Sequence, residues 1–215
     1  VLGTRGERAY STTGADKGTT STLLACVNAV GDYVQPVVIM QGVRVQANWK
    51  KDVPNHVILK ASPSAYVNKM IFLDWGRVFI SHLRAKNMLN ENNLLTMDGH
   101  YAHLFNYKFM QLMANNNVTV LGYPPHTSHV LQPLDRGPFF SLKSWWNKLL
   151  RMKIRDVGGR NLTRKEWFEV FVPTFTRSIT VKNIQGGFRV SGVFPCNRMK
   201  ALEVFVFFSV LCCLF

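Results

Sequence analysis

Residues 94–100, Leu94-Leu-Thr-Met-Asp98-Gly-His100, lead from a short apolar run into an aspartate and a glycine. The run Asn93–Met97 has the length and composition of a buried strand, and Asp98 follows it directly. In α/β sheets, ligands gather at the carboxyl ends of strands. Asp98 is therefore a candidate functional residue, although an ordinary strand-end turn also accounts for it when it is taken alone.

On either side of this segment, the apolar pattern predicts alternating strands and helices. Residues 21–28 and 33–40 are runs rich in Val, Ile and Leu, and Gly31-Asp32 between them is typical of a β-hairpin. Further predictions are helices over 68–86, 104–114, from 138, from 163 and over 180–190, a strand over 118–121, and loops over 41–62 and 122–134. This order predicts an α/β fold with a mixed sheet.

A second aspartate lies at a predicted helix start, in Leu131-Gln-Pro-Leu-Asp135-Arg-Gly-Pro138. Free backbone N–H groups and the helix dipole favour an ionised carboxylate at such a position. An ordinary helix N-cap is the simpler alternative for this residue alone.

The chain is strongly basic, with a net charge of +14 over 215 residues. Residues 135–200 carry 14 basic and 4 acidic residues, whereas residues 1–134 carry 12 and 7. This distribution favours a polyanionic partner, most simply nucleic acid, through phosphate neutralisation. A basic but otherwise unremarkable surface remains the alternative. The four cysteines form no disulfide or zinc spacing, so we expect a reducing compartment.

The longer sequence motifs around both aspartates resemble motifs of DDE transposases of the pogo/Tigger/jerky-like kind. Leu95-Thr-Met-Asp-Gly-His-Tyr-Ala-His103 is similar to the motif around the family's second catalytic aspartate. Tyr123-Pro-Pro-His-Thr-Ser-His-Val-Leu-Gln-Pro-Leu-Asp135 resembles the signature motif that leads to the family's third acidic residue. The resemblance continues in residues 24–36, 72–75 and 183–195 and covers about residues 1–200, which we expect to form one nuclease-type domain. The apolar residues 201–215 are expected to lie outside it.

This resemblance implies an RNase H-like fold, with a mixed sheet flanked by helices, and a Mg²⁺- or Mn²⁺-dependent endonuclease and transposase that acts on DNA in the nucleus. Three carboxylates in that family hold two ions, and Asp98 and Asp135 match two of them as catalytic and metal-binding residues. The first carboxylate belongs to a strand upstream of the Gly-rich segment that Val1–Gly6 resembles, and nothing of that strand is present. We therefore expect a sheet that lacks its first strand, an incomplete catalytic triad, and an inactive and poorly stable chain.

Basic and histidine residues near the two motifs are candidate nucleic-acid contacts. The predicted phosphate-binding residues are Arg136, Lys143, Lys148 and Arg151, with Lys153 and Arg155 beside them. The histidines His100, His103, His126 and His129 are expected to contact DNA or orient groups near the metal centre. A solvated helix face, or a zinc site formed by the two His-x-x-His pairs, are the alternatives. Trp145 and Trp146 are expected to pack at the core or its edge rather than stack on bases.

Two other classes of function stay open at this point. The chain is alternatively a domesticated, non-catalytic DNA-binding or scaffold protein, which needs no complete triad. The second and weaker alternative is a membrane-tethered fragment that uses residues 204–215; these are twelve nearly unbroken apolar residues, against about 20 for a bilayer span, so we expect no membrane association. Association of the chain into a homo-oligomer is left open.

Overall fold

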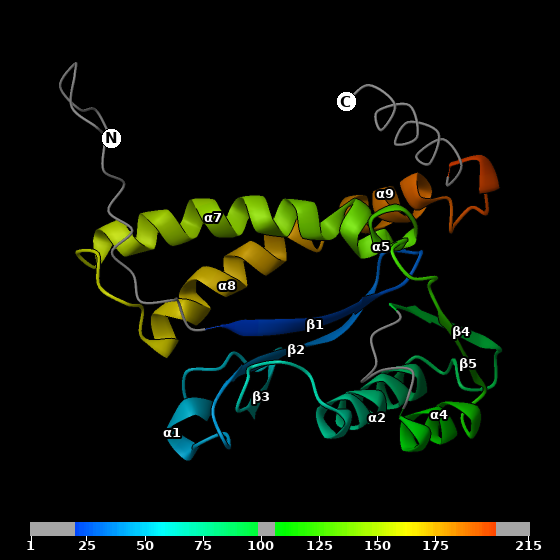
Figure 1. The fold of residues 1–215 in the computed structure, drawn as a ribbon, viewed down its shortest axis with the longest axis horizontal. Helices are drawn as coiled ribbons and strands as arrows, with labels where there is room; N and C mark the ends of the chain where they lie inside the picture. The colour runs from blue at the N-terminus through cyan, green and yellow to red at the C-terminus, as the bar shows by residue number, and fades with distance from the viewer. Residues whose placement is uncertain (1–19, 99–105, 201–215) are drawn as a thin grey trace.

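The computed structural model describes residues 20–98 and 106–200, arranged in three layers with the strands between two groups of helices (Figure 1). The strands are β1 Ser21–Val27, β2 Tyr33–Gln41, β3 Ile58–Ser62, β4 Asn93–Met97 and β5 Val118–Gly122. The helices are α1 Ala47–Lys50, α2 Lys69–Ala85, α4 Tyr107–Ala114, α5 Ser128–Leu131, α6 Pro133–Arg136, α7 Pro138–Asp156, α8 Arg164–Ser178 and α9 Val181–Ser191. The α/β class predicted from the sequence is confirmed.

The hairpin and its sheet form as predicted, with one addition. β1 runs antiparallel to β2, and the Gly31–Asp32 region joins them. Gly31 has a φ of 101°, which glycine adopts without strain. The prediction of a loop over 41–62 is wrong in part, because β3 pairs in parallel with the far edge of β2 and the short helix α1 precedes it. The helices α5 and α6 likewise occupy part of the predicted loop 122–134.

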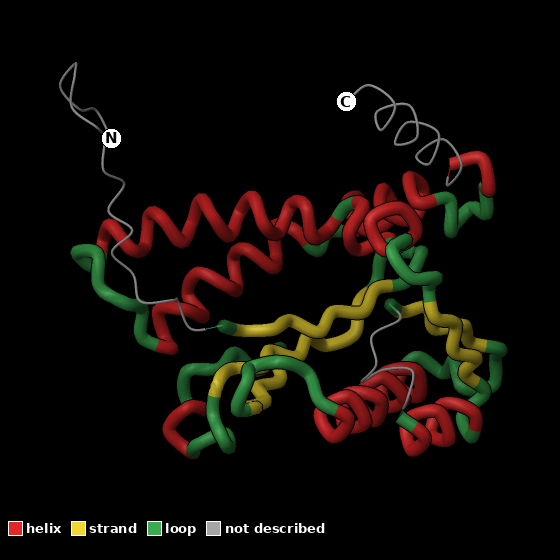
Figure 2. The backbone as a smooth tube through the Cα atoms, in the orientation of Figure 1, coloured by secondary structure: helices red, strands yellow, loops and turns green. Residues whose placement is uncertain are grey.

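The expected single mixed sheet is, across the described residues, divided into two small sheets. β1-β2-β3 form the first sheet, and β4 and β5 pair in parallel to form the second (Figure 2). β1 and β4 are therefore the neighbouring edges of two separate sheets.

The predicted helices begin and end at residues that cap them. Asn68 caps α2 through its side chain, and Thr180 caps α9 in the same way. Thr163 and Glu166 form a capping box at the start of α8, in which the side chain of each accepts from the backbone N–H of the other. Gly192 ends α9 in the left-handed conformation, with a φ of 71°.

Two apolar clusters lie on opposite faces of β2, because successive side chains of a strand point to opposite sides. Val37 and Ile39 face a cluster formed with α2, α4, β4 and β5, in which Phe109 is 0% exposed. Val38 faces a second cluster formed with α8 and α9, which includes Ile184. The first cluster is thus a packed connection between the two sheets.

Candidate active site

Asp98 lies half-buried at the carboxyl end of β4, where the neighbouring strand β5 holds it in place. The Tyr123 N–H donates to the Met97 carbonyl at 2.8 Å, and the Tyr123 hydroxyl donates to Thr96 Oγ1 at 2.8 Å. Burial raises the pKa of the Tyr123 phenol, so this hydroxyl remains a donor. Tyr123 was not named as a site residue from the sequence. The signal that could have identified it is its place at the end of an apolar strand, next to a Pro-Pro pair.

Asp135 lies on the short helix α6, which is held close to α9. Gly187 of α9 has no side chain, and a Cβ built there would overlap the Pro133 carbonyl of α6. On the adjoining turn, a Cβ at Gly137 would lie 2.6 Å from the Asn183 carbonyl oxygen. These two glycines therefore allow the backbones to approach and fix the position of Asp135.

The two aspartates influence each other electrostatically, although 36 residues separate them in the sequence. Burial is the largest cause that raises the pKa of the Asp135 carboxyl, and the Asp98 charge raises it further. Lys143 acts in the opposite direction and lowers the pKa. The fold therefore brings Asp98, Asp135 and Lys143 to one place, where a cation would relieve the repulsion between the carboxylates.

The donor set suits a hard cation only in part. Carboxylate oxygens are the ligands that Mg²⁺ prefers, and Mg²⁺ keeps several of its waters. Among residues 20–98 and 106–200, no group of three or more His, Cys, Asp or Glu is placed to hold a metal ion. Two carboxylates thus fit one ion, and a two-ion centre would need a further ligand.

The histidines give the zinc alternative no support within the described ranges. His126 and His129 are exposed in the segment between β5 and α6, and His126 has a φ of 62°. His100 and His103 lie outside the described residues.

The predicted basic face divides into separate parts on α7. At about 100° per residue, Lys148, Arg151 and Arg155 lie within about 60° of one another, and Lys143 lies roughly 80–140° away. Lys143 therefore accompanies the carboxylates, whereas the other three lie on a different face of the same helix.

Other members of the predicted set have protein partners. Lys153 pairs with Glu169 at 2.6 Å, so the prediction that it joins a phosphate-binding face is not favoured. An Arg136 guanidinium N–H group approaches the His129 carbonyl oxygen at 3.5 Å.

The two neighbouring tryptophans on α7 have different surroundings. Trp146 packs on Trp167, with ring centroids 5.2 Å apart, which confirms the packing predicted for it. Trp145 carries Lys148 and Arg177 over its ring, at 5.0 and 4.8 Å from the centroid. Its face is therefore occupied by cations.

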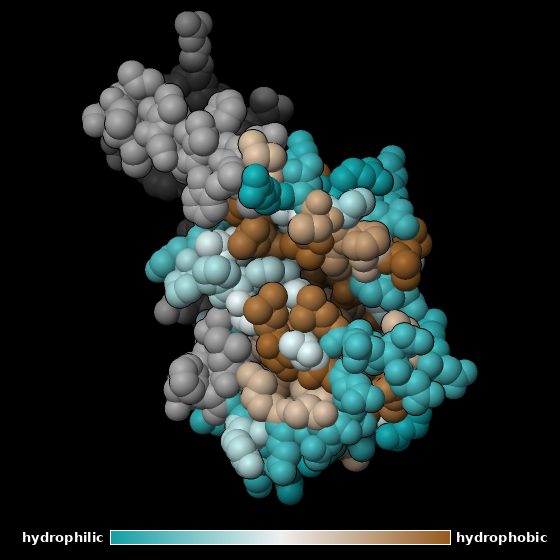
Figure 3. Space-filling view, turned by 90° about the vertical axis from the view of Figure 1, so that its right-hand side faces the viewer, coloured by the Kyte–Doolittle hydropathy of each residue, from teal (hydrophilic) through white to brown (hydrophobic). Residues whose placement is uncertain are grey.

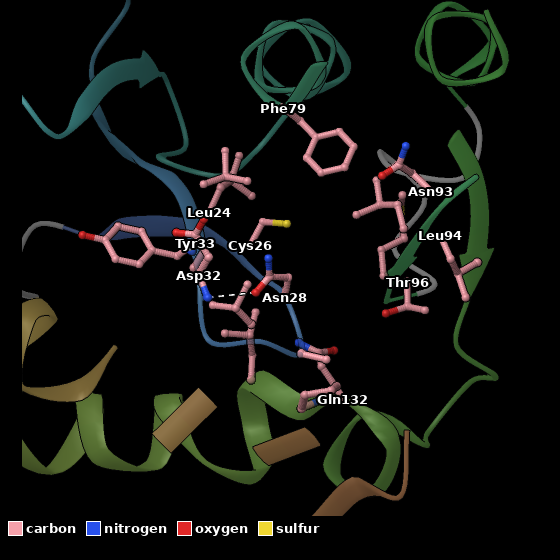
Figure 4. Close-up of a pocket in the computed structure, with 18 of the residues that line it drawn as sticks. Leu24, Cys26, Asn28, Asp32, Tyr33, Phe79, Asn93, Leu94, Thr96 and Gln132 are labelled. Atoms are coloured by element: carbon pink, nitrogen blue, oxygen red, sulfur yellow. Dashed lines mark hydrogen bonds between the residues drawn. The ribbon is translucent and has the colours of Figure 1, made fainter. Parts of the chain in front are cut away.

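A cavity of about 760 Å³ opens beside Asp98, between β1 and β4. Its surface is largely apolar, and a space-filling view from the side of β4 and β5 shows hydrophobic side chains around a hollow (Figure 3). Cys26 and Phe79 point into it from β1 and α2, and Gln132 borders it from below (Figure 4). The buried Gln132 Oε1 atom has no hydrogen-bond partner among the residues that the structure describes. Gln132 was also missed by the sequence analysis, because only its position next to an empty space makes it notable.

Residues 17–188 match the DDE superfamily endonuclease family, and the chain belongs to that family. No solved structure matches the chain.

A curated protein of Cochliobolus lunatus named "MFS-type transporter clz9" is 32% identical over 175 residues. The match covers 81% of this chain, which spans only 19% of that protein. Of the helices that the structure describes, none is both long and apolar enough to cross a bilayer.

Proposed function

We propose that this chain is a transposase-derived domain of the pogo/Tigger/jerky-like kind that binds DNA in the nucleus and holds a divalent cation through Asp98 and Asp135. The observation that carries the proposal is the electrostatic influence of Asp98 on Asp135 across a site that also contains Lys143. The long sequence motifs around both aspartates support the pogo/Tigger/jerky-like subtype.

The residues of this chain supply part of a phosphoryl-transfer site. Asp98 and Asp135 would hold Mg²⁺ or Mn²⁺, and Tyr123 keeps the strand end that carries Asp98 in place. Lys143 adds a positive charge that would attract a DNA phosphate to the carboxylates. A bound ion in such sites polarises the phosphate and lowers the pKa of its water. Cleavage by two ions needs a third carboxylate, so the isolated chain is expected to bind its ligands without cutting.

A second candidate is a domesticated protein that binds DNA, or serves as a scaffold, without any metal. The basic surface of α7 favours it, because that surface does not depend on the carboxylates. The transporter name belongs to the Cochliobolus protein, and the 19% of its length that is matched gives no ground to carry transport over to this chain.

Metal-linked stability separates these two candidates. At a free Mn²⁺ concentration ten times Kd, a bound ion should add about 1.4 kcal/mol, or roughly 3–6 °C in Tm for a chain of this size. Asp98→Asn and Asp135→Asn should each abolish this gain. Glu91→Gln, an acid on the surface, serves as the matched control and should leave it unchanged. A Tm that does not respond to Mn²⁺ in the unaltered chain would contradict metal binding.

The same variants should reveal the cost of a half-buried carboxylate without metal. Because the folded-state pKa of Asp135 lies above its ordinary 3.8, the folded chain binds more protons than the unfolded chain just above that pH. The contribution of Asp135 to stability therefore falls as pH rises through this window. Asp135→Asn should raise the metal-free Tm at pH 7, where the unaltered chain carries the full penalty.

Cleavage gives an independent test of the incomplete triad. Supercoiled plasmid with Mg²⁺ or Mn²⁺ is expected to remain intact in the presence of the purified chain. Nicking that disappears in Asp98→Ala would show that this chain already holds a complete nuclease centre.

DNA binding should depend on the basic face of α7. Lys148→Ala and Arg151→Ala should each weaken binding to all sequences alike and reduce the slope of log K against log salt by about 0.9. Lys153→Ala removes the same charge from the same helix, but Lys153 is already engaged by Glu169, so its effect should be much smaller. Fluorescence anisotropy at several salt concentrations measures this, and equal effects of all three changes would contradict the assigned face.

A further inference from the structure

One tryptophan ring in the layer of α7 and α8 carries a cation from each of these two helices. The helices lie together on one side of the strands (Figure 1), and Trp146 of α7 packs on Trp167 of α8. Trp145, the next residue on α7, has Lys148 of its own helix 5.0 Å from its ring centroid and Arg177 of α8 at 4.8 Å. Both distances lie within the range of about 6 Å over which an aromatic face attracts a cation. Trp145 therefore joins a charge on α8 to a charge on α7.

The acidic residues of the two helices do not account for this pair of cations. Asp156 is the last residue of α7, and the acids of α8, Glu166 and Glu169, lie in the first half of that helix. Glu166 pairs with Arg160 and Glu169 pairs with Lys153, at 2.6 Å in each case. The two cations over the ring thus lie at the end of the helix pair where neither helix carries an acid.

The basic face of α7 continues onto α8 through this ring. At about 100° per residue, Trp145 lies about 60° from Lys148 toward α8, and Arg151 lies about 60° from Lys148 in the other direction. Arg177 therefore extends the row formed by Lys148, Arg151 and Arg155 beyond the edge of α7. All four basic side chains are exposed, whereas Trp145 is half-buried. We refer to these five residues as the α7–α8 basic strip.

A phosphate is the ligand that the two cations over the ring fit. Their separation cannot exceed the two centroid distances combined, which is comparable with the screening length of about 10 Å in 0.1 M salt. They therefore act on the same phosphate or on neighbouring ones, and a bound phosphate would relieve the repulsion between them. The Arg177 guanidinium group suits this ligand, because its planar N–H groups match two phosphate oxygens. The ring is covered by the cations and is therefore not free to stack on a base.

We propose that Arg177 contacts a DNA phosphate and that Trp145 positions Arg177 and Lys148 for this contact, so that the duplex backbone crosses from α7 onto α8. The inference rests on the proposed function, which places DNA on α7 alone, and it adds a second helix to the interface. Trp145 acts as a positioning residue, because side chains that are already held in place lose less freedom when the phosphate arrives. Contacts of this kind place the duplex without reading its sequence.

Duplex binding by the whole chain at several salt concentrations tests the role of Arg177. Arg177→Ala should weaken binding about fivefold to tenfold in 0.1 M salt and reduce the slope of log K against log salt by about 0.9, whereas Arg177→Lys should keep the slope. Lys165→Ala is the matched control, because it removes an exposed charge from the same helix at about 120° from Arg177, and it should leave the slope unchanged. An unchanged slope in Arg177→Ala, or equal losses in both alanine variants, would overturn the proposal.

The positioning role of Trp145 predicts a loss of affinity without a loss of slope. Trp145→Leu leaves both cations in the chain, so the number of neutralised phosphates and the salt slope should stay the same. Binding should nevertheless weaken about threefold to tenfold, because the two side chains must then be ordered on binding. Trp145→Phe keeps an aromatic face and should recover most of this loss. Equal losses in both variants, or full affinity in Trp145→Leu, would contradict the positioning role.

A comparison of DNA forms separates phosphate contacts from base stacking. Duplexes of unrelated sequence should bind the unaltered chain equally well, and single strands with the same number of phosphates should bind no more tightly. Tighter binding of single strands that is lost in Trp145→Leu would show base stacking and overturn the proposal. An unaltered chain that binds no duplex would refute the proposed DNA binding itself, whereas duplex binding that is insensitive to Arg177→Ala would refute only the contact on α8.

Discussion

Gly187→Ala is expected to destabilise the chain by about 3 kcal/mol, because its new methyl group would meet backbone rather than side chain. The obstructing atoms belong to the Pro133 carbonyl of α6, and Pro138 of α7 lies beside it. Backbone atoms cannot rotate aside, so α6 must move away from α9. Since α6 carries Asp135, the Mn²⁺-dependent rise in Tm should disappear together with the lost stability. Thermal unfolding with and without Mn²⁺ measures both effects.

The neighbouring Gly186 provides the control for this change. A Cβ at Gly186 meets nothing within 4 Å, so Gly186→Ala should stabilise α9 by about 0.5–1 kcal/mol. The two variants have the same composition and lie on the same helix. Similar melting temperatures for both would refute the view that the contact between α6 and α9 positions Asp135.

Features that depend on local sequence were predictable. The hairpin turn at Gly31-Asp32 and the helix starts at Asn68 and Thr163 depend on residues close by in the sequence, and the structure has each where it was expected. Asp98 and Asp135 were named for the same reason, since a strand end and a helix start are local features.

β3 was not predictable in this way. Its five residues include a charged one, Lys60, whose ammonium group pairs with Asp74 of α2 at 2.7 Å. Its strand conformation comes from the edge of β2, a partner about twenty residues earlier in the chain. The residue pattern of 58–62 alone does not indicate that the edge of β2 is available to pair with it.

The assembly of the site also depends on contacts between distant segments. Nothing in the pattern of α9 indicates that Gly187 brings α6 close enough to bury Asp135. The pairing of Lys153 with Glu169 joins α7 to α8, and it separates this lysine from its basic neighbours. Sequence motifs thus named the candidate carboxylates, whereas packing between α6, α7 and α9 determines which charged groups lie close to them.

Phe109→Ala is expected to cost about 3–5 kcal/mol, the range for removing a fully buried aromatic side chain. The Phe109 ring lies 4.5 Å from Phe72 and 6.2 Å from Trp75, measured between ring centroids, and it covers Gly76 on α2. This cluster joins β2 to β4 on the side where no described strand connects the two sheets. For a total stability of about 5–15 kcal/mol, the loss removes a large share and should lower Tm by about 10 °C.

Tyr107→Ala on the same helix separates this packing effect from any loss of helix propensity. Tyr107 is 77% exposed, so the change should alter stability by no more than about 0.5 kcal/mol. Amide exchange should also show where in the chain each change acts. β4 and α2 should lose protection together in Phe109→Ala, and neither should change in Tyr107→Ala. If β4 kept its protection in Phe109→Ala, the connection between the sheets would have to lie elsewhere, and Asp98 would be held by β5 and Tyr123 alone.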